Sequence, residues 1–339
     1  MSDIGGTGTI RLGVLGCADV AARRVLPAAV ATPGVRVAVL ASRSRSKAEA
    51  FASRFGGEPV TGYQTLLDRE DVDAVYIALP AGMHAEWIAK ALHAGKHVLA
   101  EKPLTTVAAR TAELVRLAGR QGLVLLENFM FHRHSQHAAV RKMLDDGAIG
   151  SVRSFTATFA IPPRPANDIR YQRSLGGGAL IDVGGYPVRA AQLFLGPELE
   201  VLGAFLRYED AMGVDVSGAA LLSDASGVTA QLSFGLCHAY TSCYQFLGST
   251  GRLSLDHVFA PPVGHRPVVR LDRQDHREEL TLATDDQYAR SVEAFVDAVR
   301  ADPRSGTDTT SNQTSNQTSN QMLNQARLVD EIRSHAEPS

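Results

Sequence analysis

The chain has 339 residues, 45% of them hydrophobic, and its 34 lysines and arginines nearly balance its 36 aspartates and glutamates. That length allows two domains with separate cores, and the formal net charge of -2 excludes the basic surface expected of a protein that binds nucleic acid or an anionic membrane. We expect a cytoplasmic protein, because neither a signal peptide nor a membrane-spanning run is visible and three cysteines without metal-binding spacing suit a reducing compartment.

The first part of the chain, from Ile10 to about Asn128, alternates short apolar runs with amphipathic segments. This alternation is the pattern of a parallel sheet with helical crossovers. We predict strands at residues 11–15, 35–40, 74–78, 97–100 and 124–126, and helices at residues 20–31, 46–55, 85–94 and 107–121. Residues 1–128 are therefore expected to form an α/β domain of the nucleotide-binding kind.

The second part changes its period after a predicted helix at residues 138–145. Apolar and polar residues alternate at 153–159 and 228–234, which predicts strands. The segment Gly248-Ser-Thr-Gly251 between two such runs predicts a hairpin turn. We expect residues 129–339 to form an α+β domain with a mainly antiparallel sheet that binds substrate and supports oligomerisation.

A short repeat precedes the C-terminus, where residues 310–321 are three copies of Thr-Ser-Asn-Gln. The repeat has no apolar residue to bury, so we expect a surface insertion or a frayed loop without function. Met322, Ala326, Val329 and Ile332 follow it at helical spacing. They predict a C-terminal helix that packs back on the first domain.

A glycine-containing turn follows the first predicted strand and opens into a helix: Gly13-Val-Leu-Gly16-Cys17-Ala18-Asp19. A pyrophosphate binds at such a helix start, on backbone N–H groups that lack a partner within the helix. Gly16, Ala18 and Ala21 match the dinucleotide fingerprint imperfectly, since alanine replaces its middle glycine. By itself the motif fits a tight turn without ligand equally well.

The end of the second predicted strand bears on the choice of cofactor. It is Ala41-Ser42-Arg43-Ser44-Arg45, without the acid that binds the ribose 2′-hydroxyl of NAD. A hydroxyl and a guanidinium can hold a 2′-phosphate by charge-assisted hydrogen bonds. Ser42 and Arg43 therefore favour NADP(H), and the alternative is that they only cap and solubilise the next helix.

Two further segments supply the polar groups that a carbonyl reductase needs. Glu101-Lys102-Pro103 provides a cation, and the glycine-rich segment 176–186 provides the carboxylate of Asp182 and the phenol of Tyr186. If that segment is helical, Asp182 and Tyr186 project from one face and both can reach one substrate. The alternative for Glu101-Lys102 is a surface ion pair at a strand end.

Nearly the whole chain resembles the glucose-fructose oxidoreductase and inositol dehydrogenase family of NAD(P)-dependent sugar oxidoreductases. The resemblance lies in 16–19, 73–80, His84, 95–103, Glu127-Asn128 and 176–182. Within the family the chain is similar to the NDP-hexose 3-ketoreductases of deoxysugar biosynthesis, through 127–131, 161–163, 168–171 and 184–187. The resemblance implies a Rossmann domain, a second domain with a large open sheet, and reduction of a keto group on a nucleotide-linked deoxysugar.

The resemblance also implies roles for the three polar groups. Lys102 lies beside the nicotinamide and holds the substrate oxygen, with a cis bond often preceding Pro103. Most members carry histidine as the acid or base where this chain has Tyr186. A phenol with a pKa of about 10 suits proton donation better than abstraction, which favours reduction. Asp182 binds a neighbouring sugar hydroxyl or orients Lys102. The alternative is that Tyr186 only packs, and Gly184, Gly185 and Pro187 put a regular helix in doubt.

Other candidates contact the ligands at the edges of the site. For the cofactor they are Tyr63 at the adenine ribose, Leu79, Pro80 and His84 on the nicotinamide side, Glu101, and Arg170 at a cofactor or substrate phosphate. Tyr240 is a candidate for stacking on the substrate base. The simpler alternatives are a helix anchor for Tyr63, a helix-start role for His84 and a solvated loop arginine for Arg170. We expect no metal site, because residues two apart in His132-Arg-His134 face different ways on a helix.

The expected protein is an NADPH-dependent reductase of the C3 keto group of a dTDP-linked deoxysugar, working in deoxysugar and antibiotic biosynthesis as a homodimer or homotetramer. One alternative is an NAD(P)-dependent dehydrogenase of polyols or dihydrodiols, acting in the oxidative direction. The alternative of another class is a catalytically silent NADP-binding regulatory subunit. Measuring which nicotinamide form is consumed separates the first two, and any NADPH oxidation with a keto-sugar excludes the third.

Overall fold

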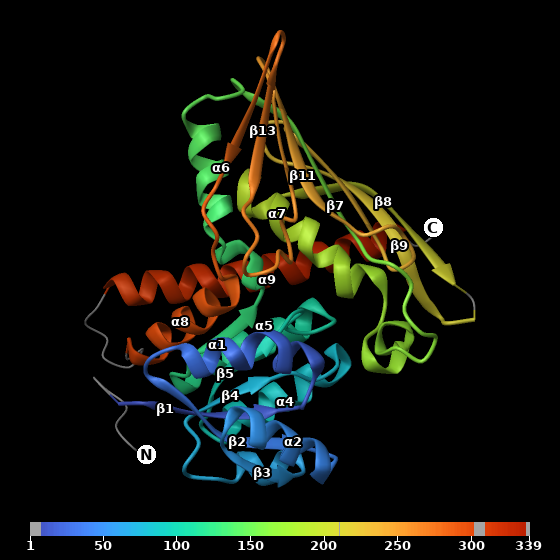
Figure 1. Cartoon of the computed structure of the whole chain (residues 1–339). Coiled ribbons are helices and arrows are strands. Elements are labelled where there is room, and N and C mark those ends of the chain that lie inside the picture. Colours follow the sequence, from blue (N-terminus) through green and yellow to red (C-terminus); the bar gives the residue numbers. More distant parts are fainter. Residues whose placement is uncertain (1–7, 210, 302–308, 337–339) are drawn as a thin grey trace. The chain divides into compact units, whose positions relative to one another are not determined.

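The computed structural model describes residues 8–209, 211–301 and 309–336 (Figure 1). Its contacts divide the chain into two compact units. The first runs to Asn128 and includes Tyr288–Leu323, and the second consists of Phe129–Gln287 with the residues from Asn324 onward. Among the described residues, no helix combines the length and the apolar character needed to cross a membrane.

The first unit contains a parallel sheet of six strands in the order β3-β2-β1-β4-β5-β6. The strands are β1 Ile10–Leu15, β2 Val35–Ser42, β3 Glu58–Thr61, β4 Ala74–Ile77, β5 His97–Glu101 and β6 Leu125–Asn128. The predicted Rossmann-type sheet is confirmed. The sequence missed β3, because that strand has four residues and only Val60 of them is buried.

Four helices of this unit correspond to predicted ranges, and two, at Tyr63–Leu67 and Gln287–Arg300, were not among those ranges. They are α1 Leu26–Ala31, α2 Arg45–Phe55, α3 Tyr63–Leu67, α4 Ala81–His93, α5 Ala108–Gln121 and α8 Gln287–Arg300. The helix predicted at residues 20–31 is not regular, since Ala21–Val25 is a π-helical segment that leads into α1. The helix predicted at residues 85–94 begins earlier, directly after Pro80.

The second unit contains an eight-stranded mixed sheet in the order β14-β13-β12-β11-β7-β10-β9-β8. The strands are β7 Val152–Ala160, β8 Glu200–Glu209, β9 Val214–Ser223, β10 Thr229–Gly235, β11 Thr241–Gly248, β12 Arg252–Asp256, β13 Val268–Arg273 and β14 His276–Thr281. The mainly antiparallel sheet is confirmed, with one parallel pair, β7 and β10. Gly248 N donates to Gly251 O at 2.8 Å, which confirms the predicted turn between β11 and β12.

The helical segments of the second unit lie mainly along this sheet. They are α6 Ser135–Asp145, α7 Gly185–Leu195, the 3-10 helices Met130–Arg133, Ile169–Tyr171 and Arg173–Leu175, and the π-helical segment Leu180–Gly184. Helix α7 packs on β7 and β10, and the π-helical segment packs on β10 (Figure 1). The middle strands of the sheet therefore support the residues around Asp182 and Tyr186.

The C-terminal helix α9 spans Thr309–Ala336. The frayed loop expected for the Thr-Ser-Asn-Gln repeat is wrong, because these residues form the first turns of α9, whereas a surface insertion stays a prediction. Ser, Thr, Asn and Gln are moderate helix formers and the repeat contains neither glycine nor proline, so a packed helix can extend into it. Met322 joins the core of the first unit, whereas Leu328 and Ile332 are buried further along the helix.

Candidate active site

Lys102 directly follows β5, whose last residue is Glu101. The Lys102–Pro103 peptide bond is cis, as the resemblance implied. The Glu101 side chain is buried, and its Oε1 accepts hydrogen bonds from Tyr76 Oη and Asn128 Nδ2, both at 2.7 Å. Asn128 Oδ1 in turn accepts from Ser291 Oγ of α8 at 2.6 Å. These bonds join the ends of β4, β5 and β6, so Lys102 extends from a rigid strand end.

Burial raises the pKa of Glu101, although its two hydrogen bonds and the charge of Lys102 act in the opposite direction. Its carboxyl group is inside the unit rather than on the surface. The alternative of a surface ion pair at this strand end is therefore excluded for Glu101.

His84, in the first turn of α4, fixes the loop on the other side of Lys102. Its Nδ1 lies 2.8 Å from the carbonyl oxygen of Pro103, and its Nε2 lies 2.8 Å from that of Leu79. A neutral imidazole has one N–H and can donate to only one of these carbonyl groups at a time. Burial, assisted by the charge of Lys102, lowers the pKa of His84 despite both contacts. The ring thus connects the loop after β4 to the loop that carries Lys102.

The turn after β1 is shaped by neighbouring strands. Gly16 has φ +101°, and a Cβ atom there would lie 2.5 Å from the carbonyl oxygen of Ala78. Glycine is therefore required at this position by the close approach of the loop after β4. Gly13 lies within β1 with Leu66 packed on it. Asp19, at the start of the following helix, forms an exposed ion pair with Arg23.

The end of β2 places a hydroxyl, a guanidinium and a phenol together. Ser42 is buried and hydrogen-bonds the thiol of Cys17, and Arg43 is exposed and hydrogen-bonds the hydroxyl of Tyr63. Burial raises the pKa of both Cys17 and Tyr63, and these hydrogen bonds oppose the increase. The cap of α2 is Ser44, whose Oγ accepts from Lys47 N, so Ser42 and Arg43 do not serve as the cap. With no carboxylate at this strand end, the donors fit the 2′-phosphate of NADP(H).

In the second unit, Arg170 lies against Asp182. Its Nε donates to Asp182 Oδ2 at 2.6 Å, and its Nη1 donates to Asp168 Oδ1 at 3.1 Å. The two carboxylates raise the pKa of Arg170 against the opposing effect of burial, so the guanidinium is charged. Its contact in this structure is the proposed catalytic carboxylate, and a role at the cofactor stays a prediction.

The glycine-rich segment is fitted to the turn that carries Arg170. Gly178 N donates to Arg170 O at 2.9 Å, and a Cβ atom at Gly177 would lie 2.5 Å from the same oxygen. Asp215 of β9 accepts from Leu180 N at 2.6 Å, and burial raises the pKa of this aspartate. Asp215 was not predicted as a site residue, although an acid between Val214 and Val216 in a strand is a detectable signal.

Asp182 lies in the π-helical segment Leu180–Gly184, and Tyr186 is the second residue of α7. The regular helix considered for this segment is therefore wrong, and the wider π-helical turn changes the angle between the two side chains. The ring of Tyr186 is packed by four phenylalanines at centroid distances of 4.9–5.7 Å: Phe129, Phe131, Phe159 and Phe259. This aromatic cluster fixes the ring, and the proposed proton donor is the hydroxyl group that the ring carries.

The candidates are divided between the units. Lys102, His84 and the residues at the end of β2 belong to the first unit, whereas Arg170, Asp182, Tyr186 and Tyr240 belong to the second. Within the second unit, Phe159 lies 4.9 Å from Tyr186 and 6.4 Å from Tyr240, measured between ring centroids. That Lys102 meets Asp182 and Tyr186 on one substrate stays a prediction.

The histidines of segment 132–137 belong to the core of the second unit. His137 Nδ1 lies 3.0 Å from Tyr244 Oη, and burial lowers the pKa of His137 to about 3. Burial also lowers the pKa of His132 and His134. Across the described parts of the chain, no group of three or more histidine, cysteine or acidic side chains is arranged to hold a metal ion.

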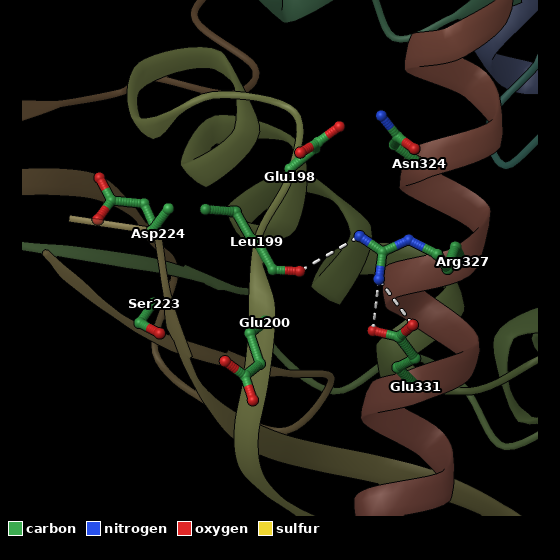
Figure 2. Close-up of a pocket in the computed structure, with 9 residues that line it drawn as sticks. Glu198, Leu199, Glu200, Ser223, Asp224, Asn324, Arg327 and Glu331 are labelled. Atoms are coloured by element: carbon green, nitrogen blue, oxygen red, sulfur yellow. Dashed lines mark hydrogen bonds and ion pairs between the residues drawn. The ribbon is translucent and has the colours of Figure 1, made fainter. Parts of the chain in front are cut away.

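A surface cavity of about 580 Å³ lies between the start of β8, the end of β9 and helix α9. Figure 2 shows Arg327 in this cavity, where its guanidinium donates to both carboxylate oxygens of Glu331 and to the carbonyl oxygen of Leu199. Glu198, Glu200 and Asp224 also line it. This acidic wall is unsuited to a nucleotide, which is an anion.

Comparison with known proteins identifies both parts of the chain. Residues 10–129 match the model of an oxidoreductase family with an NAD-binding Rossmann fold, and residues 137–254 match the GFO/IDH/MocA C-terminal domain. A dTDP-3,4-didehydro-2,6-dideoxy-alpha-D-glucose 3-reductase from Actinomadura kijaniata is 54% identical over 96% of each chain. The reductase of the same name from Streptomyces violaceoruber is 53% identical over 96% of this chain and 95% of its own.

Solved structures give the same result. A 3-ketoreductase from Actinomadura kijaniata in complex with NADP and TDP-benzene is 54% identical to this chain, with a TM-score of 0.92 over 97% of this chain and 98% of its own. Its Y186F variant, also with TDP-benzene and NADP, is 53% identical with a TM-score of 0.92 over the same shares. The chain belongs to the GFO/IDH/MocA family of oxidoreductases.

Proposed function

We propose that the protein uses NADPH to reduce the C3 keto group of a dTDP-linked keto-deoxysugar. The observation that carries this proposal is the match along nearly the whole chain, at 53–54% identity, to enzymes named as 3-reductases of such a sugar. The activity expected from the sequence agrees with these relatives. The chain is an NADP-dependent oxidoreductase, and dTDP-3,4-didehydro-2,6-dideoxyglucose is the substrate to test first.

The turn after β1 and the end of β2 would hold NADP(H). Backbone N–H groups of Gly16–Asp19 would bind the pyrophosphate, and Ser42 and Arg43 would bind the 2′-phosphate. The relative from Actinomadura kijaniata carries NADP in its solved structure. When bound, NADPH supplies the hydride for reduction of the carbonyl carbon. The residues of the chain bind, orient and protonate the substrate.

Lys102 stabilises the negative charge that develops on the substrate oxygen. The backbone that carries Lys102 is held in place before the substrate binds, because β5 ends in the buried Glu101 network and His84 holds the adjoining loop. Little reorganisation is then needed during the reaction. Glu101 and His84 act through the position of Lys102.

Tyr186 donates the proton from its hydroxyl group to the forming alkoxide. The surrounding phenylalanine rings fix the direction of the phenol. Asp182, paired with Arg170, accepts a hydrogen bond from a neighbouring sugar hydroxyl or orients Lys102. The Y186F variant of the relative still carries both ligands, which supports a role in chemistry rather than in binding.

The exposed face of the large sheet supports the expected homodimer or homotetramer. Large apolar side chains remain exposed on three of its strands: Leu202, Phe205 and Tyr208 of β8, Leu221 of β9 and Leu247 of β11. Phe205 is 65% exposed, which is unusual for phenylalanine in a strand. A cytoplasmic location likewise stays a prediction.

The decisive experiment is NADPH oxidation with a dTDP-3-keto-6-deoxyhexose generated in the assay, followed by assignment of the product configuration at C3. We expect turnover that requires the nucleotide-linked keto-sugar and that is much slower with NADH. Reduction of NADP⁺ by a free polyol, without activity on the keto-sugar, would replace the proposal with the dehydrogenase alternative.

A further inference from the structure

A second cavity of the second unit lies at one end of the large sheet. Its volume is about 280 Å³, and it is lined by the start of β11, the end of β12, the start of β13 and the loop between β12 and β13. Tyr240, His257, His265 and Arg270 are among its lining residues. The cavity is at the lower end of the size range of small-molecule sites, so it suits one ring system rather than a whole nucleotide sugar.

This cavity is close to Tyr186. Thr241, at the start of β11, pairs with Ala160 at the end of β7. Phe159, the residue before Ala160, packs against both Tyr186 and Tyr240. One aromatic ring thus separates the proposed proton donor from the cavity, so a nucleotide sugar whose sugar ring is at Tyr186 can reach the cavity with its base.

Planar side chains form the wall of the cavity. The rings of Tyr240 and His257 are nearly parallel, at an angle of 29° and a centroid distance of 6.2 Å, and His257 lies 4.8 Å from His265. Tyr240 is 46% exposed. Flat, accessible rings offer a stacking surface to a base, because stacking requires only a π-face.

His257 has an unusual backbone. Its φ is +54°, and it is the one residue other than glycine with a positive φ in the described part of the chain. This conformation is unfavourable for a residue with a Cβ atom, and glycine would adopt it without strain. The strain at His257 leads to the hypothesis that its imidazole has a function in this cavity.

The charges of the cavity favour a base over a diphosphate. Arg270 donates to Asp256 at 2.6 Å and to Glu279 at 3.2 Å, so its charge is already balanced. Burial and the neighbouring His257 lower the pKa of His265, which favours its neutral form. A neutral imidazole offers one donor and one acceptor, and these match the imide N–H and the carbonyl oxygens of a pyrimidine.

We propose that the cavity lined by Tyr240, His257 and His265 binds the thymine base of the nucleotide-sugar substrate. This inference rests on the proposed function and extends it, since it assigns the residues that recognise the nucleotide. The diphosphate then lies between the cavity and Tyr186, outside the ring-lined wall.

The test is calorimetric titration of the full-length protein, loaded with NADPH, with TDP and with thymidine. We expect Tyr240→Ala and His257→Gly each to raise the Kd for TDP about tenfold, while the Kd for NADPH is unchanged. Tyr240→Phe retains a ring and should bind TDP nearly as the wild type does. His276→Ala, at the opposite end of the β13–β14 hairpin, is the matched control and should have no effect.

His257→Gly also separates binding from folding. Because glycine relieves the strained φ, this variant should melt at the same temperature as the wild type or higher, yet bind TDP more weakly. A purely structural histidine would give the reverse pattern. If Tyr240→Ala and His257→Gly both bind TDP with the same Kd as the wild type, the proposed base site is refuted, and the proposed function is unaffected.

The same titrations distinguish the possible ligand parts. If thymidine competes with TDP for binding, the base site is supported. If inorganic pyrophosphate competes with TDP and thymidine does not, the cavity binds the diphosphate and the proposed base site is refuted. No binding of TDP to the wild type, together with no turnover of a dTDP-keto-sugar, would refute the proposed function and the base site with it.

Discussion

The segment that carries Lys102 and the segment that carries Tyr186 are made rigid by different interactions. Around Lys102 the supports are polar: Glu101 bridges three strand ends by hydrogen bonds, and His84 contacts two backbone carbonyl groups. Around Tyr186 they are four aromatic rings. Removing a single polar group should therefore disturb the two segments differently, because hydrogen-bond geometry depends on each donor whereas ring packing depends on shape.

The largest effect is expected for Lys102→Ala, which removes the cation beside the developing alkoxide. We expect kcat to fall about 10²–10³-fold, the usual consequence of losing one preorganised electrostatic group. Single-turnover NADPH oxidation measures this change. Lys90→Ala, an exposed lysine of α4, is the matched control and should keep wild-type turnover. Wild-type turnover in Lys102→Ala would exclude the assigned role.

Tyr186→Phe is expected to lower kcat about 10²-fold, since it removes only the proton donor. The ring contacts are retained, so the melting temperature and the Kd for NADPH should stay at their wild-type values. Tyr186→Ala removes the ring as well and should destabilise the protein by about 3–5 kcal/mol. Full activity of Tyr186→Phe combined with instability of Tyr186→Ala would make Tyr186 a packing residue.

Arg170 adds a polar contact close to the aromatic cluster of Tyr186. It pairs with Asp182, and Asp182 lies four residues before Tyr186 in the chain. Arg170→Met removes the ion pair with Asp182 and should reduce kcat about tenfold through misplacement of the carboxylate. The Kd for NADPH should not change if Arg170 acts through Asp182. A large increase in that Kd would instead support the role at the cofactor that the sequence suggested. Arg170→Lys keeps the charge and should recover part of the activity.

Much of the first unit could be predicted from the sequence, since a buried parallel sheet with helical crossovers has a strong pattern. The cis bond at Pro103 was also anticipated, through the family resemblance. Strand β3 escaped detection because Val60 is its only buried residue. Long-range partners were harder to predict: spacing along the chain does not reveal that Arg170 pairs with Asp182 or that Asp215 caps the π-helical segment.

The π-helical segment itself shows why local patterns were insufficient. Glycines 184 and 185 weaken a regular helix, which the sequence shows, but the wider turn depends on contacts with other elements. Gly184 packs on Phe234 of β10, and Gly185 O accepts from Gln325 Nε2 of α9 at 2.9 Å. Both neighbours come from distant parts of the chain, so only the folded unit determines how Asp182 and Tyr186 are oriented.

The two units also differ in how their buried ionisable groups make the free energy of unfolding depend on pH. In the second unit His137 has a pKa of about 3, far below that of an unfolded histidine. Its contribution to stability is present above about pH 6.5 and is lost as the pH falls towards 3, at most at about 1.4 kcal/mol per pH unit. We expect His137→Gln to make the decline in unfolding free energy with falling pH shallower, in urea unfolding followed by circular dichroism, while His84, His132 and His134 keep their share of the slope. The exposed His276→Gln should keep the wild-type slope.

Glu101 should give the smaller and opposite effect in the first unit. Because burial raises its pKa, its contribution to stability is present below about pH 4.5 and is lost as the pH rises through the folded-state pKa. The free energy of unfolding of the wild type relative to Glu101→Gln should therefore decline with rising pH, whereas that relative to His137→Gln should increase. Trp87, the single tryptophan, lies in α4 and reports unfolding of this unit by fluorescence.

A flat difference between wild type and Glu101→Gln would mean that Tyr76, Asn128 and Lys102 fully compensate the buried charge. In that case the pKa of Glu101 would be the same in the folded and unfolded protein, so the carboxylate would be ionised beside Lys102 above about pH 4.5, and its removal should shift the pH dependence of kcat. A declining difference without such a shift would show that Glu101 acts on Lys102 through position alone. The polar groups around Lys102 would then only position it, as the phenylalanine rings position Tyr186, without an electrostatic effect on it.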